Sequence, residues 1–403
     1  MKRRQRRLHF LPASNRTFRN FRRGISLHGH TQHSRESLGF ISGHIDTVPV
    51  VAQLARNAMA RYRNDYGEEV DFNRAFWTAP LSPDDAIRLE RRQIEDVLGL
   101  QGSVSLTDHD NIDGAMELPV DETGESVVSL EWTLPYGPVR FHLGVHNLPR
   151  AKARELARRL FAYTALPDES QLPALLATFE AIPEVLLVLN HPFWADQSVG
   201  RLTQHQTLHS FLRSYGGYIH ALEVSGIRSW PENQEVLDLA ERISMPVVSG
   251  GDRHGWEPST MLNLTTCRSF AEFVQEIRQD GRSEIAVMPG YQQPFGLRMM
   301  HVAWDLLRYY PSHPVERQHW ADRIFFEWKD GSVKPLSRCF KKCVAKELQL
   351  MVAVMMHLEQ QPWHTLLYAA WSLRGAAGRV PSRRDTRTPA PRPVLPGGER
   401  SVA

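Results

Sequence analysis

Short runs of Val, Ile and Leu alternate with stretches of helical spacing, and this alternation limits the fold more than any other feature of the chain. The apolar runs cover residues 25–27, 104–107, 127–130, 139–141, 185–189, 221–224 and 246–249. The helical stretches cover residues 151–163, 172–181, 208–215, 233–243 and 270–279. Uninterrupted apolar runs are typical of buried parallel strands, and their alternation with helices is typical of a parallel α/β fold. We therefore predict an α/β barrel, for which a chain of 403 residues has ample length.

Metal-ligand residue types follow almost every apolar run. They are His28, His30, Asp108, His109, Glu131, His142, His191, Asp252 and His254. In α/β barrels, side chains at the carboxyl ends of the strands meet at one mouth of the barrel. Histidine is also the commonest metal ligand, and the chain has 18 histidines. The pattern therefore predicts one metal-binding cluster.

Each of these motifs taken alone also has a purely structural interpretation. His28 and His30 are two residues apart and point to the same side of a strand, but such a pair also arises by chance. Asp110 precedes a helical pattern, as a helix cap does. His191 could be a hydrogen-bonded core histidine, behind which Pro192 fixes the turn. Five such clusters in strand-end order favour the metal site.

The same residues form a recognisable series of motifs. The series is Leu27-His28-Gly29-His30-Thr31 with Ser34 and Glu36, then Thr107-Asp108-His109-Asp110, Glu131, His142-Leu143-Gly144, His191-Pro192 and Asp252-Arg253-His254. Over residues 24–290 this series resembles the PHP superfamily, which is named for its polymerase-associated and histidinol phosphatase members. The sequence departs from the family pattern at Ser26, where an acid is usual, at Gly251, where serine is usual, and in a long insertion after the first motif.

The resemblance implies a distorted TIM-like (β/α)7 barrel that holds three divalent metal ions. The implied ligand sets are His28, His30, Glu131 and Asp252 for one ion, Glu131, His142 and His191 for a second, and Glu36, His109 and His254 for a third. Mixed nitrogen and oxygen ligands suit zinc, manganese or iron. The departures at Ser26 and Gly251 remove none of these ligands.

The charge of this ligand set indicates an anionic substrate. Six imidazoles and three carboxylates would leave three divalent ions with a surplus of positive charge, which a phosphate ester would offset. Such ions also lower the pKa of a bound water, so the nucleophile would be a metal-bound hydroxide. We therefore predict a metal-dependent phosphoesterase acting on a small phosphorylated metabolite or nucleotide. Arg253 is predicted to bind the phosphate and Asp108 to orient His109.

Two other functions remain open from the residues. Metal-activated water on a barrel also opens lactones, amides and non-phosphate esters. The basic residues Lys2, Arg3, Arg4, Arg6 and Arg7 would suit a nuclease or a nucleic-acid-associated accessory protein, although no known binding motif accompanies them.

The composition divides the chain into segments. They are a basic, solvated arm (1–23), the barrel domain (24–295) with a helical insertion (44–102, helices near 48–63 and 83–98), a mostly helical C-terminal segment (296–374) and a disordered tail (375–403). Neither a secretory signal nor a membrane span is expected, which together with only three cysteines favours the cytoplasm. Cys339 and Cys343 are predicted to be buried as small hydrophobes.

Overall fold

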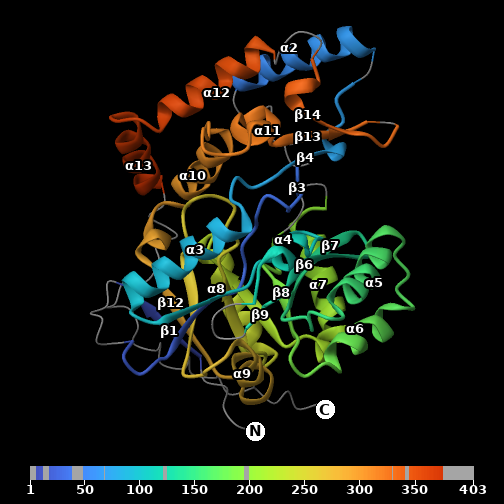
Figure 1. The fold of residues 1–403 in the computed structure, drawn as a ribbon, viewed down its shortest axis with the longest axis vertical. Helices are drawn as coiled ribbons and strands as arrows, with labels where there is room; N and C mark the ends of the chain where they lie inside the picture. The colour runs from blue at the N-terminus through green and yellow to red at the C-terminus, as the bar shows by residue number, and fades with distance from the viewer. Residues whose placement is uncertain are drawn as a thin grey trace, which may run out of the picture.

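A computed structural model describes most of the chain. It covers residues 6–11, 18–38, 49–67, 69–120, 125–194, 199–328, 330–340 and 345–374, apart from the side chains of 6, 49–52, 373 and 374. These residues form a mixed α/β structure with three β-sheets. Two sheets and their helices occupy the lower part of the molecule in Figure 1, and the third sheet lies above them with several helices.

The first sheet contains five strands in the order β1-β12-β11-β2-β5. Its strands are β1 (Arg6–Phe10), β12 (Ser283–Val287), β11 (Met261–Thr265), β2 (Arg23–Ser26) and β5 (Gln101–Val104). β2 pairs in parallel with β5, and β1 pairs in parallel with β12, whereas β11 is antiparallel to both of its neighbours. The strand predicted at 25–27 overlaps β2, whereas the strand predicted at 104–107 shares only Val104 with β5.

The second sheet has the order β10-β9-β8-β7-β6. Its strands are β10 (Val247–Gly250), β9 (Ala221–Ser225), β8 (Leu186–Asn190), β7 (Val139–His146) and β6 (Leu130–Tyr136). β8, β9 and β10 are parallel as predicted, but β7 is antiparallel to both β6 and β8. The all-parallel prediction is wrong here because only two residues separate Tyr136 from Val139, and a parallel connection needs a dozen or more. Gly137, with φ of 54°, makes the hairpin turn.

Two isolated bridges connect the first and second sheets. Gly29, just beyond β2, pairs in parallel with Arg253, just beyond β10. His109, beyond β5, pairs in parallel with Glu131 in β6. The carboxyl ends of three strands and the first residues of β6 therefore lie together. The closed barrel itself stays a prediction.

Of five helices predicted from the sequence, four pack on the second sheet and the last packs against residues of both the first and the second sheets. The five helices are α5 (Ala153–Ala165), α6 (Leu172–Glu180), α7 (Arg201–Tyr215), α8 (Trp230–Arg242) and α9 (Phe270–Gln275). In α5 the buried Ala153, Leu156, Ala157 and Leu160 recur with helical spacing, so one apolar stripe faces the core. That stripe packs in the main hydrophobic cluster with strand residues such as Leu187.

The third sheet, with the order β14-β13-β4-β3, joins segments that are far apart in the sequence. Its strands are β14 (Val333–Pro335), β13 (Ile324–Glu327), β4 (Ala75–Trp77) and β3 (Glu36–Ser37). Above it, α2 (Pro49–Tyr66) and α12 (Lys346–Leu358) lie side by side (Figure 1). The end of the predicted insertion contributes α3 and the start of β5 to the lower part, where β5 belongs to the first sheet. The rest of the insertion, with α2 and β4, packs with β3 and the predicted C-terminal segment as one unit, which we call the upper lobe. It contains strands that were not predicted.

Both the lower part and the upper lobe contain further helices (Figure 1). They are α3 (Pro83–Gln93), α4 (Asp113–Glu117), α10 (Phe295–Leu307), α11 (Val315–Gln318) and α13 (Trp363–Arg374). Short 3-10 turns are η3 (Phe72–Arg74), η5 (Gly216–Tyr218), η7 (Pro289–Gln292), η8 (Trp320–Asp322) and η9 (Leu336–Arg338), and π turns are η4 (Ile94–Leu98) and η6 (Glu276–Asp280). The two helices predicted in the insertion correspond to α2 and to α3 with η4.

The predicted basic arm is partly wrong. Arg6–Phe10 is strand β1, held along β12, and His9 contacts Glu284 at 2.7 Å. Residues 1–5, which include Lys2, Arg3 and Arg4, lie outside the described residues, as do Cys343 and the predicted tail at 375–403. Cys339 is buried as predicted. Among the described helices, none combines the length and the apolar character needed to cross a membrane.

Candidate metal centre

The predicted ligand residues meet around the carboxylate of Glu131, which is fully buried in β6. Its Oε2 lies 3.1 Å from His28 Nε2, 3.3 Å from His109 Nε2 and 3.5 Å from His30 Nε2. Its Oε1 lies 3.3 Å from His191 Nε2 and 3.4 Å from His142 Nδ1. One carboxylate therefore faces five imidazoles, and these separations suit ligands that share cations about 2 Å from each donor atom.

Asp252 closes this cluster from the end of β10. Its Oδ1 lies 3.4 Å from His30 Nε2, and its Oδ2 lies 4.0 Å from His191 Nε2. Asp252 has φ of 51° and His191 has φ of 25°, a region that residues other than glycine rarely occupy. Such backbone strain persists where the surrounding structure enforces it, commonly at functional sites.

Glu36 completes the cluster from β3 in the upper lobe. Its Oε2 lies 3.2 Å from His254 Nε2 and 3.3 Å from His109 Nε2, and its Oε1 lies 3.4 Å from His30 Nδ1. Three groups in the described chain have donor atoms close enough to hold an ion, namely His28–His30–Glu131, His30–Glu36–His254 and His109–Glu131–His142. All nine predicted ligand residues thus come together. The groups differ from the predicted sets, because His109 joins His142 and His30 takes its place beside Glu36. His191 and Asp252, although close to the cluster, belong to none of the three groups.

Two of these histidines, His28 and His254, are oriented by partners on their other ring nitrogens. His28 Nδ1 lies 2.6 Å from Glu223 Oε1, and the same carboxylate accepts a hydrogen bond of 2.9 Å from the backbone N–H of His191. His254 Nδ1 lies 2.8 Å from the carbonyl oxygen of Asp252. A carboxylate at Nδ1 keeps the proton there and leaves the Nε2 lone pair free for a metal.

Glu223 was missed at the sequence level. It lies inside the apolar run 221–224, in β9, all of whose residues are buried. A single acidic residue in such a run is costly to bury without a partner. Its presence in the apolar run could therefore have indicated that Glu223 contacts a buried polar group. Gly250 on the neighbouring strand makes room for it, since a Cβ at Gly250 would lie 1.5 Å from Glu223 Oε1. The glycine is needed there for space rather than for a turn.

Asp108 does not orient His109, which corrects the prediction. Its carboxylate accepts hydrogen bonds from the backbone N–H of Thr31 at 2.6 Å and from the Thr31 hydroxyl at 2.8 Å. Asp108 and His109 are adjacent in an extended segment, so their side chains point in different directions. Asp108 therefore fixes the loop that carries His30. Burial raises the pKa of Asp108 to about 6.

Arg253 is also placed differently from the prediction. Its guanidinium is buried, with Nε 3.1 Å from Glu90 Oε1. The two terminal nitrogens donate hydrogen bonds of 3.0 Å to the carbonyls of Gly255 and His30. Because these partners occupy the guanidinium, Arg253 anchors the loop to α3, and the prediction that it binds phosphate is wrong.

Arg228 is a cation that faces the metal centre. Its Nη2 lies 3.5 Å from Asp252 Oδ2, and its guanidinium lies 5.3 Å from the ring centroid of Trp194. The carbonyl of Arg228 accepts hydrogen bonds from Arg298 at 2.9 Å and from the Tyr291 hydroxyl at 3.0 Å, which fix its backbone. The side chain stays 21% exposed, so solvent and ligands can reach it. Arg228 follows the apolar run 221–224. It was not predicted, because only metal-ligand residue types were considered after each run.

The electrostatics of the cluster favour cations. Burial opposes ionisation of Glu36, Glu131 and Asp252, but the neighbouring histidines outweigh it and hold each pKa well below its usual range. Burial lowers the pKa of His30 to about 4. At His109 burial acts in the same direction, yet Glu36 and Glu131 raise its pKa to about 10. Buried anions packed among histidines form a donor set that suits zinc, manganese or iron.

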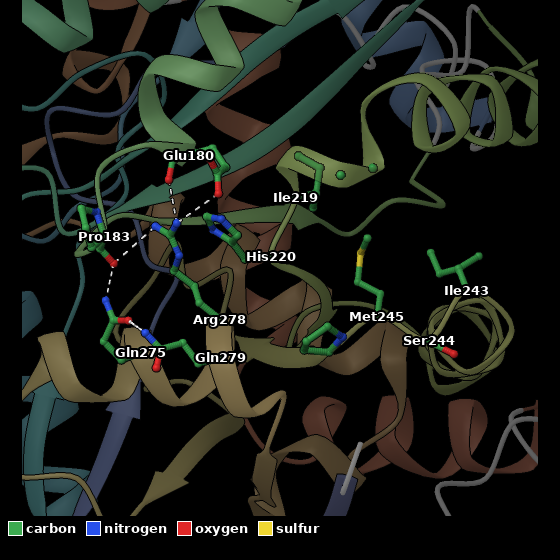
Figure 2. Close-up of a pocket in the computed structure, with 13 residues that line it drawn as sticks. Glu180, Pro183, Ile219, His220, Ile243, Ser244, Met245, Gln275, Arg278 and Gln279 are labelled. Carbon is green, nitrogen blue, oxygen red and sulfur yellow. Dashed lines mark hydrogen bonds and ion pairs between the residues drawn. The ribbon is translucent and has the colours of Figure 1, made fainter. Parts of the chain in front are cut away.

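A separate hollow of about 520 Å³ lies near the amino ends of strands β8, β9 and β10 (Figure 2). Arg278 lies within it but donates hydrogen bonds to the carbonyls of Glu180, Ile182 and Val185. His220 accepts a hydrogen bond of 2.9 Å at Nδ1 from the backbone N–H of Leu187. The lining contains no residue of the metal cluster, so this hollow is not the candidate site.

Comparisons with known proteins give little information about this chain. No protein-family model matches it, and no curated protein matches its sequence. Among solved structures, an amidohydrolase from Chromobacterium violaceum, with bound sulfate and no metal, aligns with 49% of this chain and 92% of its own, at 15% identity and a TM-score of 0.31. A candidate metal-dependent phosphoesterase from Bifidobacterium adolescentis aligns with 44% of this chain and 84% of its own, at 16% identity and a TM-score of 0.30. These scores are too low to support an argument about fold or function.

Proposed function

We propose that this protein is a metal-dependent phosphoesterase that hydrolyses a small phosphorylated metabolite or nucleotide. The observation that carries the proposal is the buried Glu131 carboxylate, which lies within 3.5 Å of nitrogen atoms from five histidines. Asp252, Glu36 and His254 extend this donor set to nine residues, enough for the three divalent ions that the resemblance to the PHP superfamily implies.

Divalent ions at such a site lower the pKa of a coordinated water and stabilise the attacking and leaving oxygens of a phosphate ester. The protein residues have separate roles. The histidines and carboxylates would hold the ions, and Glu223 and Asp108 fix the candidate ligands His28 and His30 through the contacts described above. Arg228 lies where its guanidinium can bind a phosphate oxygen.

The charge balance supports a phosphate ester over a neutral ester or amide. Three carboxylates cannot neutralise three divalent ions, and a dianionic phosphate would supply much of the missing charge. Arg228 beside Asp252 adds a further positive group at the same mouth. A neutral substrate would leave the surplus positive charge of the three ions uncompensated.

We also infer that β2, β5, β6, β7, β8, β9 and β10 close into the predicted seven-stranded barrel. The pairs Gly29–Arg253 and His109–Glu131 support this, because they connect the two sheets at both ends of that series of strands. The ligands would then lie at one mouth of the barrel, as the strand-end pattern predicts.

The test compares two aryl esters with the same leaving group. We expect the protein with manganese or zinc to release p-nitrophenol from p-nitrophenyl phosphate and to act poorly on p-nitrophenyl acetate. His28→Ala combined with His30→Ala should abolish the phosphate reaction, while His205→Ala on helix α7 should leave it unchanged. Activity of the double variant equal to wild type, or turnover of the acetate alone, would refute the proposal.

A further inference from the structure

An apolar cavity of about 360 Å³, partly open to solvent, lies in the upper lobe. It lies between α2, α12 and strand β13, and its walls include Ala58, Met351, Ile324 and Phe326. No residue of the metal cluster lines it, although Leu38, in its wall, follows Glu36 by two positions. The cavity is therefore distinct from the candidate metal centre.

The size of this cavity is unusual for a protein interior. Interiors are packed as densely as organic crystals, and voids much larger than a water molecule are few. A dry apolar void of about 150 Å³ already binds benzene. The cavity in the upper lobe is more than twice that size, so the described side chains leave space for an apolar molecule.

The shape of the cavity favours a linear molecule over a round one. On α2 its lining residues are Ala55, Ala58, Met59 and Tyr62, which follow one face of the helix. Ala55 and Tyr62 are seven positions apart, or about 10 Å along the helix, so this wall is elongated along the helix axis. Met351 on α12 faces the same space, and methionines adapt readily to the outline of a bound chain.

The chemistry of the walls excludes charged ligand groups from the interior. All the described lining residues are apolar or aromatic apart from the thiol of Cys339. Burial raises the pKa of Cys339 to about 11, so this thiol is neutral, and its Sγ lies 3.4 Å from the carbonyl oxygen of Pro335. A phosphate or a sugar would find no compensating partners there.

We propose that this cavity binds an unbranched aliphatic chain of medium length. The proposal does not depend on the phosphoesterase function, because it rests on residues of the upper lobe alone.

The test is isothermal titration calorimetry of the full-length protein with decan-1-ol, and with adamantan-1-ol as a bulky apolar alternative. We expect saturable binding of one decan-1-ol per chain, with a negative heat-capacity change from apolar burial and a higher melting temperature. Adamantan-1-ol should bind at least tenfold more weakly. No saturable binding of decan-1-ol, or equal affinity for both alcohols, would overturn the proposal.

Matched variants on α2 locate the binding. Ala58→Phe places a ring in the cavity and should weaken decan-1-ol binding at least tenfold, whereas Ala60→Phe, at an exposed position of the same helix, should not. Undiminished affinity in Ala58→Phe would show that the alcohol binds elsewhere and overturn the proposal. Should Ala58→Phe fail to fold, Met351→Phe and the wild-type titration decide the question.

Discussion

Glu223 is the residue on which the orientation of His28 most depends. Its carboxylate contacts His28 Nδ1 at 2.6 Å and also accepts the backbone N–H of His191, so it holds two candidate ligands at once. A carboxylate can only accept, which places the ring proton on Nδ1 and directs Nε2 toward Glu131.

Glu223→Gln should therefore weaken metal binding. A glutamine amide that donates to Nδ1 would leave the proton on Nε2, which then cannot bind a cation. We expect about 10- to 100-fold lower metal affinity, measured by competition with a chromogenic chelator, with an unchanged far-UV spectrum. Glu284→Gln, which alters the contact with His9 outside the site, is the control. Equal affinity in Glu223→Gln and wild type would contradict this role.

Arg228 should determine how well a phosphate ester binds. Losing a hydrogen bond to a charged group costs about 1.5–3 kcal/mol, so Arg228→Ala should lower kcat/KM by roughly 10- to 100-fold, mainly through KM. Arg228→Lys should retain part of the activity because it keeps the charge but not the planar fork. The comparison variant is Arg201→Ala, on the exposed surface of α7. An unchanged KM in Arg228→Ala would exclude the proposed contact.

At the scale of elements, α3 is held at its start by Ser82. The Ser82 hydroxyl accepts the backbone N–H of Asp85, and Pro83 follows in the first turn. Ser82→Ala should lower the free energy of unfolding by about 1 kcal/mol, measured by urea denaturation. Ser214→Ala, in an exposed part of α7, should change it little. A Ser82→Ala protein as stable as wild type would contradict the capping role.

The sequence predicted the strands and helices with local patterns better than the pairing between distant segments. The parallel strands β8, β9 and β10 and the helices around them follow directly from apolar runs and helical spacing. The β6–β7 hairpin was misread because the short spacing around Gly137 was not weighed. Strands β4 and β13 are only three and four residues long and pair across the whole barrel segment, so no local pattern indicates them.

The candidate site also divides into residues that local patterns predict and residues that depend on contacts between distant segments. Eight of the nine ligand residues could be predicted from the residues alone, because each closely follows an apolar run and is a residue type that binds metal. Glu36, in the unpredicted strand β3, was indicated only by the resemblance to the PHP superfamily. The residues that support them could not be placed by the same rule. Asp108, Glu223, Arg228 and Arg253 take their roles from neighbours distant in the sequence, which only the fold brings into contact.

At the scale of the whole molecule, buried neutral histidines make stability depend on pH. Burial, together with nearby Arg278, lowers the pKa of His220 to about 3. The unfolded chain takes up a proton near pH 6.5, whereas folded His220 does not until far lower pH. Its contribution is therefore fully present above about pH 6.5 and is lost as pH falls toward the folded pKa.

His220→Gln should flatten this dependence while keeping an acceptor for the backbone N–H of Leu187. We expect the free energy of unfolding of wild type to fall between pH 6.5 and pH 4.5 more steeply than that of the variant, by at most about 1.4 kcal/mol per pH unit for one proton. Denaturant titrations at several pH values measure it. Identical slopes would show that His220 is not buried in its neutral form.

The central claim is that Glu131 and its neighbouring histidines hold divalent cations. Elemental analysis of freshly purified, gel-filtered protein tests it most directly, with Glu131→Gln analysed in parallel. We predict more than one equivalent of zinc, manganese or iron per wild-type chain and a clear loss in Glu131→Gln. A wild-type protein that contains none of these metals, and takes up neither zinc nor manganese in equilibrium dialysis, would contradict the claim.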